Sequence, residues 1–120
     1  MTVDLFADRV AQVRQRFVST LEGKIDNTCA ALPLCDGNEP LAIAAVAEAY
    51  RCMHGLVGIG RTVGFPAVGE AAHDVETILR PAYHTGRGLT AEEISLLKTS
   101  LQVLREIAAR ELQSAKTVSQ

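Results

Sequence analysis

Residues 40–66 read PLAIAAVAEAYRCMHGLVGIGRTVGFP, a stretch with the pattern of one amphipathic helix followed by a tight turn. Pro40 suits the first position of a helix, because the N–H that proline lacks would be unpaired there. Residues 64–66 (GFP) have the composition of a turn, and Pro66 suits the start of another helix. The stretch therefore predicts a helix over about 40–63 and a second helix directly after it.

The segment before this stretch, from about residue 4 to 32, also has helical periodicity. Its apolar positions recur about every 3.7 residues, close to the α-helical period of ~3.6. Gly23 interrupts the pattern and predicts a break or bend, and Pro33 ends the helix because it cannot donate an N–H. The residues expected on the core face are Phe6, Val10, Val13, Phe17, Leu21, Ile25, Thr28 and Leu32.

Two further helices are expected after the turn. One runs from Pro66 to near Tyr83, and the other begins after Thr90, which forms a capping box with Glu93. The polar tail from about Ser114 is expected to fray. Four amphipathic helices with short connections predict an all-α antiparallel four-helix bundle, up-down-up-down, as a single domain over residues 1–120.

Composition narrows the classes of function. The chain is 48% hydrophobic with a formal net charge of −2, so a nucleic-acid interface is not expected. Its longest apolar run, residues 41–47, is far shorter than the ~20 residues that a membrane span needs. Three cysteines form no C-x-x-C pair, which disfavours a disulfide framework and favours a reducing cytoplasm.

A helical wheel of the second helix places His54 opposite its apolar half. Arg51, Gly58 and Arg61 are its neighbours on that exposed side, since residues three, four and seven apart share a helix face. An exposed imidazole is mostly unprotonated at neutral pH and is a nucleophile. The other interpretation is an ordinary surface histidine beside glycines that permit close helix packing, as Gly60 does by its position. The apolar half is expected to include Cys52, Leu56, Ile59 and Val63.

Residues 54–64, HGLVGIGRTVG, resemble the signature of the histidine-containing phosphotransfer (HPt) family. That signature is H-x-L-K-G with a second glycine ten residues after the histidine. His54, Leu56, Gly58 and Gly64 occupy the matching positions, and the four helices extend the resemblance over most of the chain.

The resemblance implies a role for each matched residue. His54 would accept a phosphoryl group, Gly58 would clear space for a receiver domain, Leu56 would anchor the core, and Gly64 would form the turn. Val57 departs from the pattern, because the family has a lysine there that helps to hold the phosphoryl group. Arg51 or Arg61 could supply the missing positive charge, which is a hypothesis from the wheel alone.

The expected function is therefore phosphoryl transfer on His54, to or from an aspartate of a response-regulator receiver domain. A hybrid histidine kinase is the other expected partner. The chain has no kinase ATP motif, so it would be a phosphoryl carrier without a cofactor, and the divalent metal would belong to the receiver. A monomer is expected, docking its partner through the face that comprises Tyr50, Arg51, His54, Val57, Gly58 and Arg61.

Two rival interpretations stay open: a helical interaction module without phosphotransfer, which Val57 favours, and a dimer that packs through the glycine-rich face. A metal site is not expected. His73 has Glu70 and Glu76 three residues away on each side, but a di-iron centre needs a second E-x-x-H motif. The glycines of residues 55–64 do not form a nucleotide-binding loop.

Overall fold

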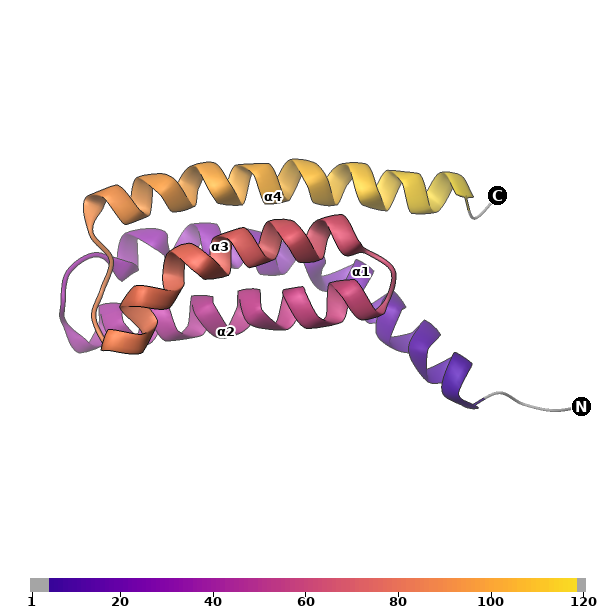
Figure 1. Ribbon diagram of the computed structural model, residues 1–120, viewed down its shortest axis with the longest axis horizontal. Helices are drawn as coiled ribbons and strands as arrows, with labels where there is room; N and C mark the ends of the chain where they lie inside the picture. The colour runs from indigo at the N-terminus through magenta and orange to yellow at the C-terminus, as the bar shows by residue number, and fades with distance from the viewer. Residues whose placement is uncertain (1–4, 119–120) are drawn as a thin grey trace, which may run out of the picture.

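The computed structural model describes residues 5–118, and the side chains of residues 5–115. Its elements are α1 (Leu5–Ala31), the 3₁₀ turn η1 (Leu32–Cys35), α2 (Pro40–Thr62), α3 (Pro66–Thr85) and α4 (Ala91–Val118). Consecutive helices run in opposite directions (Figure 1). The predicted all-α, up-down-up-down four-helix bundle is confirmed. Within residues 5–118, no helix is long and apolar enough to cross a membrane.

The helix ends follow the expected signals with two exceptions. Pro33 lies in η1 directly after α1, and Pro40 and Pro66 each occupy the first position of their helix. The break expected at Gly23 is absent, because α1 is one continuous helix through this exposed glycine. The tail expected to fray from Ser114 continues as helix to Val118.

The most extensive helix contact in the bundle is between α2 and α3, where a glycine of each helix faces the backbone of the other. A Cβ at Gly60 would lie 3.4 Å from the Gly69 nitrogen, and one at Gly69 would lie 3.3 Å from the Val57 carbonyl oxygen. Side chains at either position would push the helices apart. Gly60 therefore has the packing role that its wheel position indicates. Behind this contact lies a core that includes Phe17, Leu21, Leu56, Phe65, Leu79, Leu97 and Leu104.

The first three turns of α1 extend beyond the bundle (Figure 1). Burial on α1 begins at Phe17, and residues 5–16 are exposed except for the half-buried Val10. The expectation that Phe6 and Val13 belong to the core is therefore wrong. The reason is the course of α1, whose first turns lead away from the other helices of the bundle (Figure 1).

Side chains cap the N-termini of α3 and α4. The Glu111 carboxylate of α4 accepts hydrogen bonds from the backbone N–H groups of Ala67 and Val68, at 3.1 and 2.9 Å. At α4, the Thr90 N–H donates to Glu93 at 2.9 Å and the Glu93 N–H donates to the Thr90 hydroxyl at 3.1 Å. This is the predicted capping box, and Arg87 adds two hydrogen bonds to the same Glu93 carboxylate.

Replacing Glu93 by glutamine is expected to lower the free energy of unfolding at neutral pH by about 1–2 kcal/mol, the range for a lost helix cap. Hydrogen bonds from Arg87 outweigh burial and lower the pKa of Glu93 from 4.5 to about 2. A carboxylate whose pKa is lower in the folded state stabilises the fold above the unfolded pKa, and this contribution is lost as the pH falls toward 2. Chemical denaturation between pH 7 and 2 should show that the free energy of unfolding falls less steeply with decreasing pH in Glu93→Gln than in wild type.

Glu92→Gln, at the neighbouring exposed position, is the matched control, because Glu92 makes neither contact of the capping box. An equal loss of stability in both variants would contradict the role assigned to Glu93.

Candidate functional site

His54 lies on α2 with 70% of its side chain exposed, and its Nδ1 atom is 2.7 Å from Oε1 of Glu76. Glu76 comes from α3, and its side chain is only 4% exposed. The two residues are 22 positions apart, but the tight turn after α2 brings α3 back along it. An exposed imidazole is thus held from behind by a buried carboxylate.

Glu76 is the centre of a small polar network. The Tyr50 hydroxyl also hydrogen-bonds to its carboxylate, and Nη2 of Arg80 lies 3.8 Å from Oε1. Burial by itself raises the pKa of Glu76. The hydrogen bonds from His54 and Tyr50, together with the positive charge of Arg80, outweigh burial, so the pKa lies below its ordinary value of 4.5. Glu76 is therefore ionised at neutral pH.

The ionised carboxylate determines which tautomer His54 adopts. A carboxylate without a proton can only accept hydrogen bonds, so the Nδ1 atom of His54 must carry a proton and donate a hydrogen bond to Glu76. The lone pair then resides on Nε2, the ring nitrogen that does not face Glu76. The same arrangement of carboxylate and imidazole prepares histidine for nucleophilic or basic chemistry in other proteins.

The ring of Tyr50 lies beside the ring of His54. Tyr50 lies nearly parallel to His54, with ring centroids 6.0 Å apart and an interplanar angle of 13°. The Tyr50 ring also stacks on Tyr83 at 4.1 Å and makes an edge contact with His84 at 6.1 Å. Tyr50 is half-buried, so it supports the His54 ring from the side and offers only part of its surface to a partner.

The exposed face of α2 is rotated from the one that the wheel predicts. Val57, expected on the exposed docking face, is only 8% exposed, so its expected exposure is wrong. Ile59, expected in the core, is exposed, so that prediction is wrong too. The close contact of α2 with α3 through Gly60 and Gly69 explains both, because α3 covers the side of α2 where Val57 lies and leaves the opposite side open.

The cations near His54 also differ from expectation. Arg51 and Arg61 are both exposed, but the Arg61 guanidinium is paired with Glu70 at 2.6 Å. Arg80, from α3, lies beside the carboxylate that holds His54. Sequence reasoning missed Glu76 and Arg80 as parts of this site. The available signal was a charged residue on the apolar face of the third helix, four residues after Ala72 and three before Leu79.

Beside the His54 ring lies an open hollow of about 420 Å³. A Cβ built on Gly55 or Gly58 would meet no other atom within 4 Å, so neither glycine is needed for packing within the chain. Both α1 and α2 contribute apolar side chains to the lining of this hollow. The hollow is lined by Val13, His54, Gly55, Gly58, Ile59, Thr62 and Val63.

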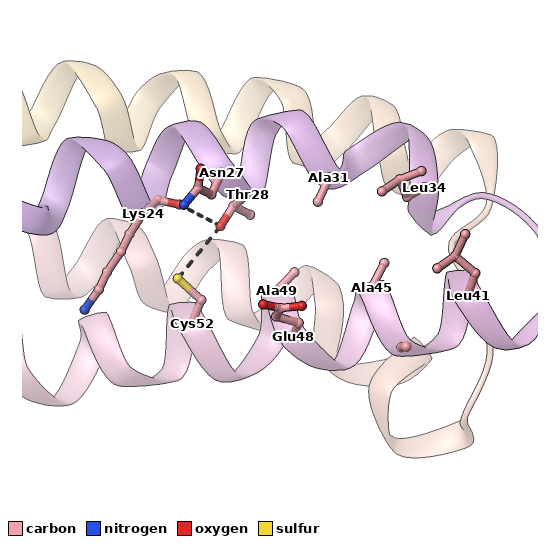
Figure 2. A pocket seen from close by; sticks show the side chains of 11 residues that line it. Lys24, Asn27, Thr28, Ala31, Leu34, Leu41, Ala45, Glu48, Ala49 and Cys52 are labelled. Carbon is pink, nitrogen blue, oxygen red and sulfur yellow. Dashed lines mark hydrogen bonds between the residues drawn. The ribbon is translucent and has the colours of Figure 1, made fainter.

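A second concave feature lies between α1 and α2 and has a volume of about 310 Å³ (Figure 2). Thr28 lies in it, with its hydroxyl 2.9 Å from the Lys24 carbonyl oxygen and 3.9 Å from the Cys52 sulfur. Its lining includes Ala49 and Cys52, which lie on the side of α2 opposite His54. This pocket therefore contributes nothing to the surroundings of His54.

The residues considered for a metal site are separated. Glu70 pairs with Arg61 and Glu76 with His54, so neither carboxylate forms a cluster with His73. Across residues 5–118 there is no group of three or more His, Cys, Asp or Glu side chains that could hold a metal ion.

Leu56 is buried in the core, and Gly64 adopts a φ of 95° in the turn between α2 and α3. A comparison with protein families found that the model of the Hpt domain matches residues 12–107. Neither curated proteins nor solved structures gave a significant match. Hpt domains take part in histidine phosphotransfer within phosphorelays, and they interact there with receiver domains and kinases. The match includes the whole of α2 and α3 and most of α1 and α4, and the chain therefore belongs to the Hpt domain family.

Proposed function

We propose that His54 accepts a phosphoryl group from an aspartyl phosphate of a receiver domain and passes it to another receiver. A kinase domain is the other possible donor. The observation that carries this proposal is the 2.7 Å contact between Nδ1 of His54 and the buried Glu76 carboxylate. It supports a nucleophilic Nε2 atom that faces away from the protein at an exposed position.

The transfer step follows from this geometry. The Nε2 lone pair attacks the phosphorus atom, an N–P bond forms, and the P–O bond to the partner's aspartate breaks. The aspartate leaves as a carboxylate and keeps the electron pair. The imidazole gains positive charge in this step, and the ionised Glu76 stabilises that charge through the Nδ1–H group, which keeps its proton. The receiver supplies the divalent metal that the phosphoryl group requires.

The docking face that we propose differs from the predicted one. It keeps Arg51 and Gly58 around His54, loses Val57, and gains Gly55 and Ile59. A receiver that approaches along these residues meets the glycines directly beside the imidazole. Transient signalling contacts are smaller than obligate ones, so a modest interface formed by a monomer is sufficient.

A helical module that binds a receiver without phosphotransfer is the alternative, because valine replaces the family's lysine at position 57. Val57 is buried, so this position cannot hold a phosphoryl group. Arg51 and Arg80 are the cations that could do so, one exposed on α2 and the other beside Glu76.

Incubation with a panel of phosphorylated receiver domains separates the two functions. The carrier function predicts an acid-labile, base-stable label on the wild-type chain. The module predicts binding to a receiver, detected by isothermal titration calorimetry, without any label. Absence of label with every receiver would contradict the proposed function.

Replacing Gly58 by alanine is expected to stabilise the fold by about 0.5–1 kcal/mol, because alanine is the better helix former and the site has room for it. The added methyl group lies one turn from His54, on the proposed docking face. Transfer from a receiver should therefore slow, while labelling by a small donor such as phosphoramidate should not. Stopped-flow transfer and thermal melting measure the two effects.

Gly23→Ala is the matched control. Gly23 is a helical glycine with equally open surroundings, but it lies on α1 and does not line the hollow beside His54. It should give the same gain in stability and wild-type transfer. Unchanged transfer in Gly58→Ala would contradict a receiver that docks closely at this glycine.

A further inference from the structure

The extension of α1 carries a narrow apolar strip. At about 100° per residue, the side chains of Phe6, Val10, Val13 and Phe17 fall within a sector of about 60°. Phe17 is buried in the core, whereas Val13 is exposed and Phe6 is 78% exposed. The strip thus begins inside the bundle and continues outward along α1, where the other helices described, up to residue 118, do not cover it (Figure 1).

The strip is continuous with the hollow beside His54. Val13 and Ile59 line that hollow. Both also line another groove, of about 530 Å³, that follows α1 and includes Arg9 and Phe17. From Val13, the strip extends two helical turns, about 10 Å, to Phe6. A partner surface of ordinary size, about 800 Å², is broad enough to cover His54 and reach this strip.

Arginines flank the strip on both sides. Arg14 lies on one side of it, and Arg9 and Arg16 lie on the other, at about 40–60° from its edges. All three are exposed, and the exposed residues 5–16 contain only one acidic side chain, Asp8. The guanidinium of Arg14 lies 5.0 Å from the Phe65 ring centroid, so it is anchored close to the bundle.

These charges argue against a second copy of the chain on the strip. When two helices pair along an apolar strip, the flanking positions of one face the flanking positions of the other, in both parallel and antiparallel pairs. Here arginine would face arginine in either orientation. A lipid surface is also disfavoured, because a helix that lies in a membrane buries a broad apolar face, and this sector is narrow.

We propose that the strip docks a helix of the same receiver domain that exchanges phosphoryl groups with His54, and that carboxylates flank the apolar residues of this helix. The inference rests on the proposed function and adds the chemistry of the partner. The outer part of the strip, Phe6 and Val10, precedes the segment matched by the family model, residues 12–107. The strip therefore extends the docking surface around His54 beyond that segment. We infer that this additional contact selects among receivers.

Phe6→Asp tests the strip, and Leu5→Asp is its matched control. Both residues are in the first turn of α1, and Leu5 is also exposed, at 67%, but it lies outside the strip beyond Arg9. The probe is whichever phosphorylated receiver domain, from those encoded in the same genome, labels the wild-type chain fastest. Single-turnover transfer is measured at increasing receiver concentration. This series gives the half-saturating receiver concentration and the maximal rate as separate values.

Phe6→Asp is expected to raise the half-saturating receiver concentration about tenfold, the size of effect for an exposed aromatic contact, with an unchanged maximal rate. Leu5→Asp should behave as wild type. Arg9→Glu should also raise half-saturation and weaken its salt dependence, because it removes a charge that faces carboxylates. Identical half-saturation in all four proteins, or an equal rise in both aspartate variants, would overturn the inference and leave the proposed function intact.

Two further measurements test whether a second copy of the chain or a membrane occupies the strip instead of a receiver. Sedimentation equilibrium that shows a wild-type dimer dissociated by Phe6→Asp would assign the strip to a second copy. Co-sedimentation with vesicles of phosphatidylcholine and phosphatidylglycerol, lost in the same variant, would assign it to a membrane. Either result overturns the inference. Failure of every receiver, and of phosphoramidate, to label the wild-type chain would remove the proposed function, and the inference with it.

Discussion

Replacing His54 by glutamine is expected to abolish acid-labile labelling of the chain, both by a phosphorylated receiver and by phosphoramidate. Glutamine has no nucleophilic ring nitrogen, so the N–P bond cannot form. Its amide N–H can still donate to the Glu76 carboxylate, which therefore keeps a partner. Because the His54 side chain is largely exposed, the melting temperature should stay close to that of wild type. Autoradiography and thermal melting measure the two properties.

The other two histidines provide the controls. His73 is half-buried and His84 is exposed, both on α3, and neither is held by a buried carboxylate. His73→Gln and His84→Gln should retain the label. Label that persists in His54→Gln and disappears in one of these variants would contradict the assignment of His54 as the acceptor.

Replacing Glu76 by glutamine is expected to slow transfer to His54 by about 10–100-fold, the usual effect of removing a partner that orients a reactive histidine. The substitution keeps the shape of the side chain but removes its charge. The amide can accept a hydrogen bond from Nδ1–H or donate one to an unprotonated Nδ1, so the tautomer with its lone pair on Nε2 is no longer enforced. The positive charge that develops on the imidazole also loses its buried counter-charge. Single-turnover transfer from a receiver measures this rate.

Glu70→Gln is the matched control for Glu76→Gln. It is the same substitution on the same helix, at an exposed glutamate that pairs with Arg61. Its transfer rate should remain within about twofold of wild type, because exposed ion pairs contribute little. Equal rates for wild type, Glu70→Gln and Glu76→Gln would show that the contact between His54 and Glu76 does not prepare the nucleophile.

The helices could be predicted from the sequence, whereas the surroundings of each helix could not. Apolar spacing and the prolines at positions 33, 40 and 66 give the element order and most of the boundaries. Periodicity shows which face of a helix is apolar, but it does not show whether another helix covers that face. Phe6 and Val13 continue the pattern of Phe17, yet the first turns of α1 lead away from the other helices, so they stay exposed.

The nucleophile could be predicted from its helix, but its partner could not. The wheel of α2 places His54 on the exposed side, and the structure agrees. The same wheel misplaced Val57 and Ile59, because one helix alone does not reveal that α3 approaches from one side through Gly69. Glu76 lies on a different helix, and only the packing of α3 on α2 brings it to His54.

The most direct test of the central claim is to locate the phosphoryl group on the wild-type chain by ¹⁵N and ³¹P NMR. The chain is labelled with ¹⁵N in its histidines and phosphorylated by a receiver. We expect phosphorus bonded to Nε2 of His54, with the proton retained on Nδ1 and hydrogen-bonded to the Glu76 carboxylate. Phosphorus on Nδ1 of His54, or on any other residue, would contradict the account.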